Sequence, residues 1–306
     1  MNKKNIPAAS LALTAWSFAE LYCFIFSRYR GIAFIFDLAK KHSDGYYKKR
    51  NNYRASLLAK EHTRHELKSR TGARLVGDYY CCGDKPCGKI AFIVHGYRSD
   101  GAETAGPFAD YYFSRGWDVF YCDHVSHGDS SGVIIGYDYF ESVDCLDWLE
   151  YLSATFGSDI QIILHGFSMG GGTVLKMSDR VPQQVRFICS DSGYADAVQM
   201  IKPKIPPLYP AIRRLNMLIG KYDIEDTDVR PNLRNARVPI LFVHGTEDPT
   251  VPFAMGKELY ELCPTEKDCL FTEGVLHIES IYHFREEYES KLDDFIERYA
   301  EKGERK

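Results

Sequence analysis

A serine flanked by glycines is the first residue of this chain whose setting suggests chemistry. Ser168 stands in the run Gly166-Phe167-Ser168-Met169-Gly170, which fits the pattern G-x-S-x-G. An apolar, strand-like stretch precedes it and a helical pattern follows it, so the chain must turn sharply at the serine. Such a turn needs small neighbours and exposes the hydroxyl, while the backbone N–H of Met169 is directed at a developing oxyanion. We predict a nucleophile at Ser168.

The same glycines permit two other interpretations. A glycine-rich entry to a helix needs no catalytic role, and a glycine-rich loop can hold a phosphate group. A P-loop, however, would need a lysine directly after the glycines, and the first lysine here is Lys176. We therefore favour the nucleophile over the phosphate site.

A serine hydroxyl is a weak nucleophile unless a base accepts its proton, and histidine is the usual base. The chain has ten histidines, so their positions must discriminate among them. His277 lies in the loop between the last strand-like run and the terminal helical pattern. His283 falls about two turns into that pattern, and His95 and His244 each precede a glycine at a strand end, where we expect them to shape turns. We predict that His277 is the base.

The third member of such a site is a carboxylate that orients the imidazole and stabilises its protonated form. Asp248 follows a strand-like run and directly precedes Pro249, which indicates a turn at the end of the sheet. Glu247 is an adjacent alternative, and Asp191 at the end of another strand-like run is a second one. Each of the three could instead cap a turn or a helix. We favour Asp248.

An oxyanion site needs a second donor beside the N–H of Met169. Gly96 and Tyr97 follow the apolar run that ends at His95, and a glycine at this turn lets the backbone approach a substrate closely. We expect the backbone N–H of Tyr97 to be that donor, and its side chain could line the entrance to the site.

These residues sit at the ends of elements that the apolar pattern predicts. Residues 65–68 and 73–80 flank a turn and indicate a hairpin. Unbroken apolar runs are typical of central parallel strands covered on both faces, and helical patterns alternate with them. The predicted strands are 89–95, 117–122, 160–166, 185–191, 239–244 and 267–271, and the predicted helices are 104–115, 139–155, 169–180, 253–262 and 278–299. In such α/β sheets ligands bind beyond the carboxyl ends of the strands, where the candidate residues lie.

The composition fits a globular protein with one sizeable core. The chain has 306 residues, a net charge of −4 and 45% hydrophobic residues, which argues against disorder and against a polytopic membrane protein. The slightly acidic balance gives no support to nucleic-acid binding. Nine cysteines, an odd number, favour a reducing compartment, and the cluster Cys81, Cys82 and Cys87 lacks the second ligand pair of a zinc finger. We expect no metal and no organic cofactor.

Residues 8–26 form a largely apolar stretch, long enough to cross a bilayer but interrupted by Glu20. Residues 28–70 follow with twelve Lys and Arg against four acidic residues, and this flank would keep the body of the protein in the cytoplasm if the stretch spans a membrane. The alternative is an amphipathic helix on a membrane surface or over the substrate entrance. We expect a cytoplasmic protein, with membrane contact through residues 8–26 as an open question.

The motifs together resemble the α/β-hydrolase superfamily, in which the nucleophile, the acid and the histidine follow one another along the chain. Here that order is Ser168, Asp248, His277. The His95-Gly96 turn, the glycine-rich turn at Ser168 and the segment 244–252 all look like members of that fold. The segment 123–132 is similar to the family's D-x-R-G-H-G-x-S-x-G loop, but it has Val and Ser where the family carries Arg and Gly.

The resemblance covers residues 65–302 and implies an α/β-hydrolase fold with a mostly parallel, doubly wound sheet. It also implies a serine hydrolase, most simply an esterase of small acyl or aryl esters, with peptidase, thioesterase, acyltransferase and non-catalytic binding as alternatives. In that family the 123–132 loop braces the floor of the site, so no catalytic role is assigned to His124 or His127. The chain looks like bacterial members with an N-terminal apolar segment and a small cap.

We therefore expect an N-terminal segment over residues 1–64 and a hydrolase domain over 65–306, with a cap insertion at about 195–235. Residues 202–210 are too rich in proline for a helix, whereas 211–222 form a short apolar helix candidate. Its apolar side chains either line a pocket for an acyl or aryl group or only pack against the domain. The oligomeric state is not indicated by the sequence.

Overall fold

The computed structural model describes residues 8–29 and 42–302, with side chains from residue 16 onward. Eight strands form one sheet in the order β1-β2-β4-β3-β5-β6-β7-β8. Their bounds are β1 Thr63–Lys68, β2 Arg74–Tyr80, β3 Lys89–Val94, β4 Asp118–Asp123, β5 Gln161–Phe167, β6 Val185–Asp191, β7 Ile240–Gly245 and β8 Lys267–Thr272. Strands β1 and β2 form an antiparallel hairpin, β2 also pairs antiparallel with β4, and β3 to β8 are parallel. The predicted α/β-hydrolase fold with an N-terminal hairpin is confirmed.

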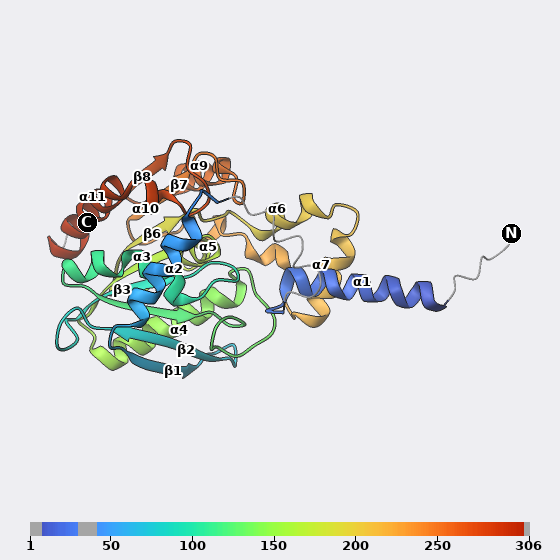
Figure 1. Ribbon diagram of the computed structural model, residues 1–306, viewed down its shortest axis with the longest axis horizontal. Coiled ribbons are helices and arrows are strands. Elements are labelled where there is room, and N and C mark those ends of the chain that lie inside the picture. Colours follow the sequence, from blue (N-terminus) through green and yellow to red (C-terminus); the bar gives the residue numbers. More distant parts are fainter. Residues whose placement is uncertain (1–7, 30–41, 303–306) are drawn as a thin grey trace.

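Helices cover both faces of this sheet (Figure 1). Their bounds are α1 Ala8–Phe26, α2 Tyr46–Leu58, α3 Gly101–Ser114, α4 Tyr139–Phe156, α5 Met169–Lys176, α6 Ala197–Ile201, α7 Tyr209–Ile219, α8 Arg230–Leu233, α9 Phe253–Leu262, α10 Ser280–His283 and α11 Arg285–Phe295, with 3₁₀ turns at Lys202–Lys204 and Ile224–Thr227 and a π turn at Ile296–Glu301.

Strand β3 explains why the central runs are apolar without alternation. Phe92 belongs to a core that also contains Trp148 of α4, whereas its neighbour Ile93 belongs to a second core with Phe108 of α3. Both strand residues are fully buried. Because successive side chains of a strand point to opposite faces, a strand covered on both sides must be apolar at every position.

Three helical regions differ from the sequence-based expectation. Helix α2 was not predicted, and it packs against α3 so closely that a side chain at Gly106 would lie 2.7 Å from the backbone of Tyr53. Helix α5 ends at Lys176, before the expected limit of 180, and turns lead from it to Pro182, which cannot continue a helix. The expected terminal helix of residues 278–299 is divided into α10, α11 and the π turn.

Helix α1 runs beside α7, and its N-terminal part projects away from the sheet (Figure 1). Its C-terminal part is buried: Phe26 is 1% exposed and contacts the rings of Tyr22, Tyr137 and Tyr222, whereas Trp16 is 52% exposed. Across residues 8–29 and 42–302, no helix combines the length and the apolar character needed to cross a membrane. Residues 30–41 of the basic flank lie outside the described residues.

The segment between β6 and β7 carries α6, α7 and α8. Residues 202–204 form a 3₁₀ turn, and α7 begins at Tyr209 with Pro210 in its first turn, where a proline costs no hydrogen bond. The expected short helix is therefore present, shifted by two or three residues. Tyr209 and Ile212 are buried, whereas Leu218 is 68% exposed. The division of the chain at residue 64 and the cap boundaries stay predictions.

Candidate active site

Strand β5 passes into α5 through a single strained residue. Ser168 has φ 56° and ψ −116°, and its N–H donates to the backbone oxygen of Asp191 at 2.8 Å. A side chain at Gly166 would lie 2.1 Å from the oxygen of Gly170, and one at Gly170 would lie 2.0 Å from the oxygen of Val94. Only glycine fits at both positions, which is the physical reason for the pattern in the sequence.

The structure brings the three predicted side chains into one hydrogen-bonded row. His277 Nε2 lies 2.8 Å from Ser168 Oγ, and His277 Nδ1 lies 2.6 Å from Asp248 Oδ2. Because a carboxylate can only accept, Nδ1 carries the proton and Nε2 is free to accept from the serine hydroxyl. Ser168 is partly exposed, whereas His277 and Asp248 are buried. The arrangement can transfer a proton from the hydroxyl to the imidazole.

The turn after β7 fixes the carboxylate of Asp248. Its Oδ1 accepts from the backbone N–H groups of Thr250 at 2.7 Å and Val251 at 2.8 Å, which leaves Oδ2 for His277. Burial alone would raise the pKa of Asp248, but the charge of His277 and hydrogen bonds with His244 and His277 outweigh it and hold the pKa below its usual range. The carboxylate therefore stays ionised across the neutral pH range.

Neither alternative carboxylate is hydrogen-bonded to His277. Glu247 is exposed. Asp191 is fully buried, where its Oδ1 accepts from the hydroxyl of Ser192 at 2.9 Å and its Oδ2 from the hydroxyl of Tyr288 at 3.0 Å. Burial raises the pKa of Asp191 to about 6. The rival histidine, His283, lies at the end of α10, with Nε2 3.2 Å from Glu279 Oε2.

The loop after β3 passes directly beside Ser168. A side chain at Gly96 would lie 3.2 Å from Ser168 Cβ. The next residue, Tyr97, donates its hydroxyl to the backbone oxygens of Phe24 at 3.0 Å and Ile25 at 2.9 Å, so its side chain joins the loop to α1. Met169, the first residue of α5, is buried next to the serine. The oxyanion role of the Tyr97 and Met169 N–H groups stays a prediction.

Three buried histidines lie behind this loop. His95 Nε2 accepts from the N–H of His124 at 2.9 Å, and His127 Nε2 accepts from the N–H of Arg98 at 3.0 Å. Burial, together with the charges of neighbouring histidines, lowers the pKa of His124 well below the usual value and that of His127 to about 3. These rings are therefore neutral, and they hold the β3 loop and the 123–132 segment together.

Two residues that position the His277 loop were missed in the sequence. Ser192, with φ 52°, accepts from the N–H of Ile278 at 3.3 Å. Glu279 is buried, and its Oε1 accepts from the N–H of Ser43 at 3.0 Å. Ser192 directly follows strand β6, and this place at the carboxyl end of a predicted strand could have indicated it. No local signal exists for the contact of Glu279, because its partner is 236 positions away in the chain.

Two groups of side chains have atoms close enough together to hold a metal ion among the described residues. In the first, Cys82, Cys87 and Asp118, the Asp118 carboxylate already accepts from the N–H groups of Cys82 at 2.7 Å and Cys87 at 2.8 Å. The cysteine cluster noted in the sequence therefore belongs to a hydrogen-bonded turn. The second group is Cys122, His124 and Cys145.

A groove of about 640 Å³ lies away from the candidate active site. Ser168, Asp248 and His277 are not among its lining residues. Its walls come from α4, α5 and the segment before β7. The lining residues are Thr71, Tyr139, Phe140, Ser142, Val143, Lys176, Asp179, Arg180, Asp226 and Asn232.

Comparisons with known proteins agree with this architecture. The profile of a family described as serine aminopeptidase, S33, matches residues 85–222. The uncharacterized protein YqkD of Bacillus subtilis is 24% identical over 78% of this chain and 80% of its own length. Human alpha/beta hydrolase domain-containing protein 17C is 25% identical over 64% of this chain and 55% of its own length.

Solved structures with the same fold include esterases. The Pyrococcus furiosus esterase Pf2001 superposes with a TM-score of 0.63 at 20% identity, over 80% of this chain and 95% of that one. An esterase from Exiguobacterium antarcticum superposes with a TM-score of 0.56 at 16% identity, over 76% of this chain and 98% of that one. At these identities the likeness concerns the fold.

Proposed function

We propose that this chain, which belongs to the α/β-hydrolase superfamily, is a serine hydrolase that cleaves carboxylic esters. The observation that carries the proposal is the pair of hydrogen bonds at His277, 2.8 Å to Ser168 Oγ and 2.6 Å to Asp248 Oδ2. In this proposal Ser168 is the nucleophile, His277 the base and Asp248 the carboxylate that holds the imidazole in place.

The reaction follows from where the protons lie. His277 Nε2 accepts the hydroxyl proton as Ser168 Oγ attacks the ester carbonyl carbon, and Asp248 stabilises the imidazolium that forms. The N–H groups of Tyr97 and Met169 would donate to the oxyanion of the tetrahedral intermediate. The imidazolium then protonates the departing alcohol and leaves an acyl-enzyme. A water molecule, deprotonated by His277, attacks that acyl group; the acid is released as the imidazolium returns the proton to Ser168 Oγ.

The choice of an ester rests on two supports. Two solved structures that share the fold are named as esterases, and apolar side chains of α6 and α7 pack in one cluster with Met169, the residue next to the proposed nucleophile. We propose that this apolar side of the site receives the acyl or aryl group. The second candidate is a peptidase, because the matching profile is that of a serine aminopeptidase. A panel of p-nitrophenyl esters, acyl-thioesters and aminoacyl amides separates the two, and amide cleavage without ester cleavage would reverse the order.

Replacing the nucleophile tests the proposal. We expect Ser168→Ala to lower the turnover of short p-nitrophenyl esters by at least about 10³-fold and to abolish labelling by a fluorophosphonate probe, since an alanine has no oxygen to acylate. Ser158→Ala, an exposed serine in the turn before β5, is the matched control and should behave as the parent chain. Full activity or full labelling of Ser168→Ala would refute the proposal, and folded parent protein that is not labelled would favour a binding protein.

We propose separately that the protein is cytoplasmic, and membrane contact through residues 8–26 stays an open question. Alkaline carbonate extraction of the expressed chain tests it. Release into the supernatant would exclude a membrane anchor, in agreement with the lack of a membrane-spanning helix among the described residues, and retention in the pellet would contradict that finding.

A further inference from the structure

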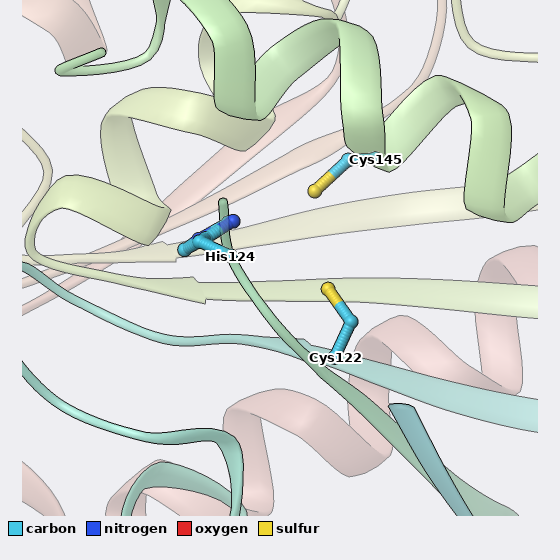
Figure 2. A group of neighbouring side chains, drawn as sticks. All are labelled: Cys122, His124 and Cys145. Carbon is cyan, nitrogen blue, oxygen red and sulfur yellow. The ribbon is translucent and has the colours of Figure 1, made fainter. Parts of the chain in front are cut away.

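A group of three buried side chains lies between the sheet and α4, outside the candidate active site. Cys122 is at the end of β4, His124 follows it by two residues, and Cys145 is on α4. Figure 2 shows the two sulfur atoms and a ring nitrogen directed toward the space between the three residues. The donor atoms all lie within 4.8 Å of one another. Cys145 is 0% exposed and the other two are 1% exposed.

The hydrogen bonds of His124 determine which of its ring nitrogens carries the proton and which presents a lone pair to the cysteines. Its Nε2 lies 3.1 Å from the backbone oxygen of His95, and a carbonyl can only accept, so Nε2 carries the proton. Nδ1 is then an acceptor, and within the described part of the chain this buried atom has no hydrogen-bond partner. A ring that donates one N–H to a backbone carbonyl and presents the other nitrogen bare has the arrangement of a metal-ligating histidine.

We propose that Cys122 Sγ, His124 Nδ1 and Cys145 Sγ together bind one thiophilic d¹⁰ cation, Zn²⁺ or Cu⁺. Thiolate and neutral imidazole are the donors that these ions prefer over the oxygen ligands of Mg²⁺ and Ca²⁺. On binding, two metal–sulfur bonds and one metal–nitrogen bond form, and the two thiol protons leave to solvent. No electron is transferred and no other reactant is needed.

The net charge of the proposed site favours Zn²⁺, whereas its number of donor atoms favours Cu⁺. Zn²⁺ with two thiolates leaves a buried site with no net charge, which a desolvated position requires, but structural zinc usually has four ligands. Cu⁺ accepts few soft ligands, although it would leave one negative charge. Because both thiols lose their protons when the ion binds, affinity for either ion should increase with pH.

The position of the site predicts what an ion would stabilise. The N–H of His124 donates to His95 Nε2, and its ring Nε2 donates to the His95 backbone oxygen. An ion held by His124 therefore tightens the β3 loop next to Ser168. Because it binds the folded chain and not the unfolded one, it should raise the thermal midpoint of unfolding. This inference does not depend on the proposed hydrolase activity.

The test uses the full chain, expressed with zinc or copper salts and purified anaerobically with a reductant, because buried donors load most readily during folding. Metal content is measured by plasma mass spectrometry, and affinity by competition with a chromophoric chelator for Zn²⁺ or Cu⁺. We expect one ion per chain, a higher thermal midpoint on loading, and at least about 100-fold weaker binding in Cys145→Ser.

The matched control is the double variant Cys82→Ser, Cys87→Ser, which removes the other pair of neighbouring cysteines and should keep the ion. X-ray absorption on the loaded parent chain gives a second measurement if Cys145→Ser does not fold: two sulfur ligands and one nitrogen ligand support the site, with zinc–sulfur distances of about 2.3 Å. Absence of a bound ion, loss of the ion only in the control, an oxygen-dominated ligand shell, or a Cys122–Cys145 disulfide in the purified chain would each overturn the inference.

Discussion

At the scale of single residues, Asp248 illustrates how position selects among chemically equal groups. Asp248, Glu247 and Asp191 all follow predicted strands, and each carries a carboxylate that could orient an imidazole. The turn after β7 gives Asp248 two backbone donors on Oδ1 and directs Oδ2 at His277. Glu247 is exposed, and Asp191 is occupied by Ser192 and Tyr288.

Asp248→Asn should therefore lower kcat for esters by about 10⁴-fold with little change in KM. The amide would donate to His277 Nδ1 where the carboxylate accepts, which holds the imidazole in the wrong tautomer. Steady-state kinetics on a p-nitrophenyl ester measures the effect. Glu247→Gln is the neighbouring control and should keep the parent rate; a loss confined to Glu247→Gln would mean that the acid has been misidentified.

At the scale of elements, the β5–α5 turn depends on a close backbone approach between helix α5 and strand β3. Gly170 sits where the first turn of α5 meets the end of β3, and a side chain there would lie 2.0 Å from the oxygen of Val94. Backbone atoms cannot move aside as the tip of a long side chain can. The close contact of α5 with the sheet, and with it the position of Ser168, therefore requires glycine.

We expect Gly170→Ala to destabilise the chain severely, by more than about 4 kcal/mol, because β3 and α5 would have to separate. Chemical denaturation, or the soluble yield if the variant does not fold, measures the loss. Gly83→Ala is a suitable control, since nothing lies within 4 Å of the side chain it would add. Equal stability of the two variants would contradict the packing described for this turn.

The N-terminal elements extend the site beyond the sheet. Tyr97 donates to the backbone of Phe24 and Ile25 in α1, and Glu279 beside His277 accepts from the N–H of Ser43, just before α2. Two of the loops that carry candidate site residues, those of Tyr97 and His277, are thus hydrogen-bonded to the segment before residue 64.

At the scale of the whole molecule, burial of acidic groups should make stability depend on pH. Asp138 is fully buried with its Oδ1 accepting from Thr173, and burial raises its pKa to about 7; burial likewise raises the pKa of Glu141 to about 8. In the unfolded chain such groups titrate near about 4. Between these values the native state binds more protons than the unfolded state, so the free energy of unfolding falls as pH rises.

Asp138→Asn isolates this effect, because an amide resembles the protonated acid and keeps an oxygen for Thr173. Relative to the parent chain, the variant should gain roughly 1.4 kcal/mol per pH unit between about pH 4 and 7, and nothing further above pH 7. Urea denaturation across this range measures the difference. Asp84 is exposed, and Asp84→Asn should show no such trend. If the difference in unfolding free energy between Asp138→Asn and the parent chain does not change with pH, the Asp138 carboxyl of the folded parent has an ordinary pKa.

The sequence by itself determined those features that depend on local pattern. Apolar runs, several of them unbroken, identified the six parallel strands, because a strand covered on both faces is predominantly apolar. The glycines around Ser168 identified the turn from β5 to α5, because only that residue type allows the backbone contacts seen there. The order of Ser168, Asp248 and His277 followed from their places after predicted strands.

Tertiary structure alone decided everything that depends on contacts between distant segments. Helix α2 has no strong apolar pattern, and its position follows from the approach of Tyr53 to Gly106. The contact of Glu279 with Ser43 and the convergence of Cys122, His124 and Cys145 join positions that no local spacing relates. A periodic pattern reports which face of an element is buried, but the partner that buries it is set only when the whole chain packs.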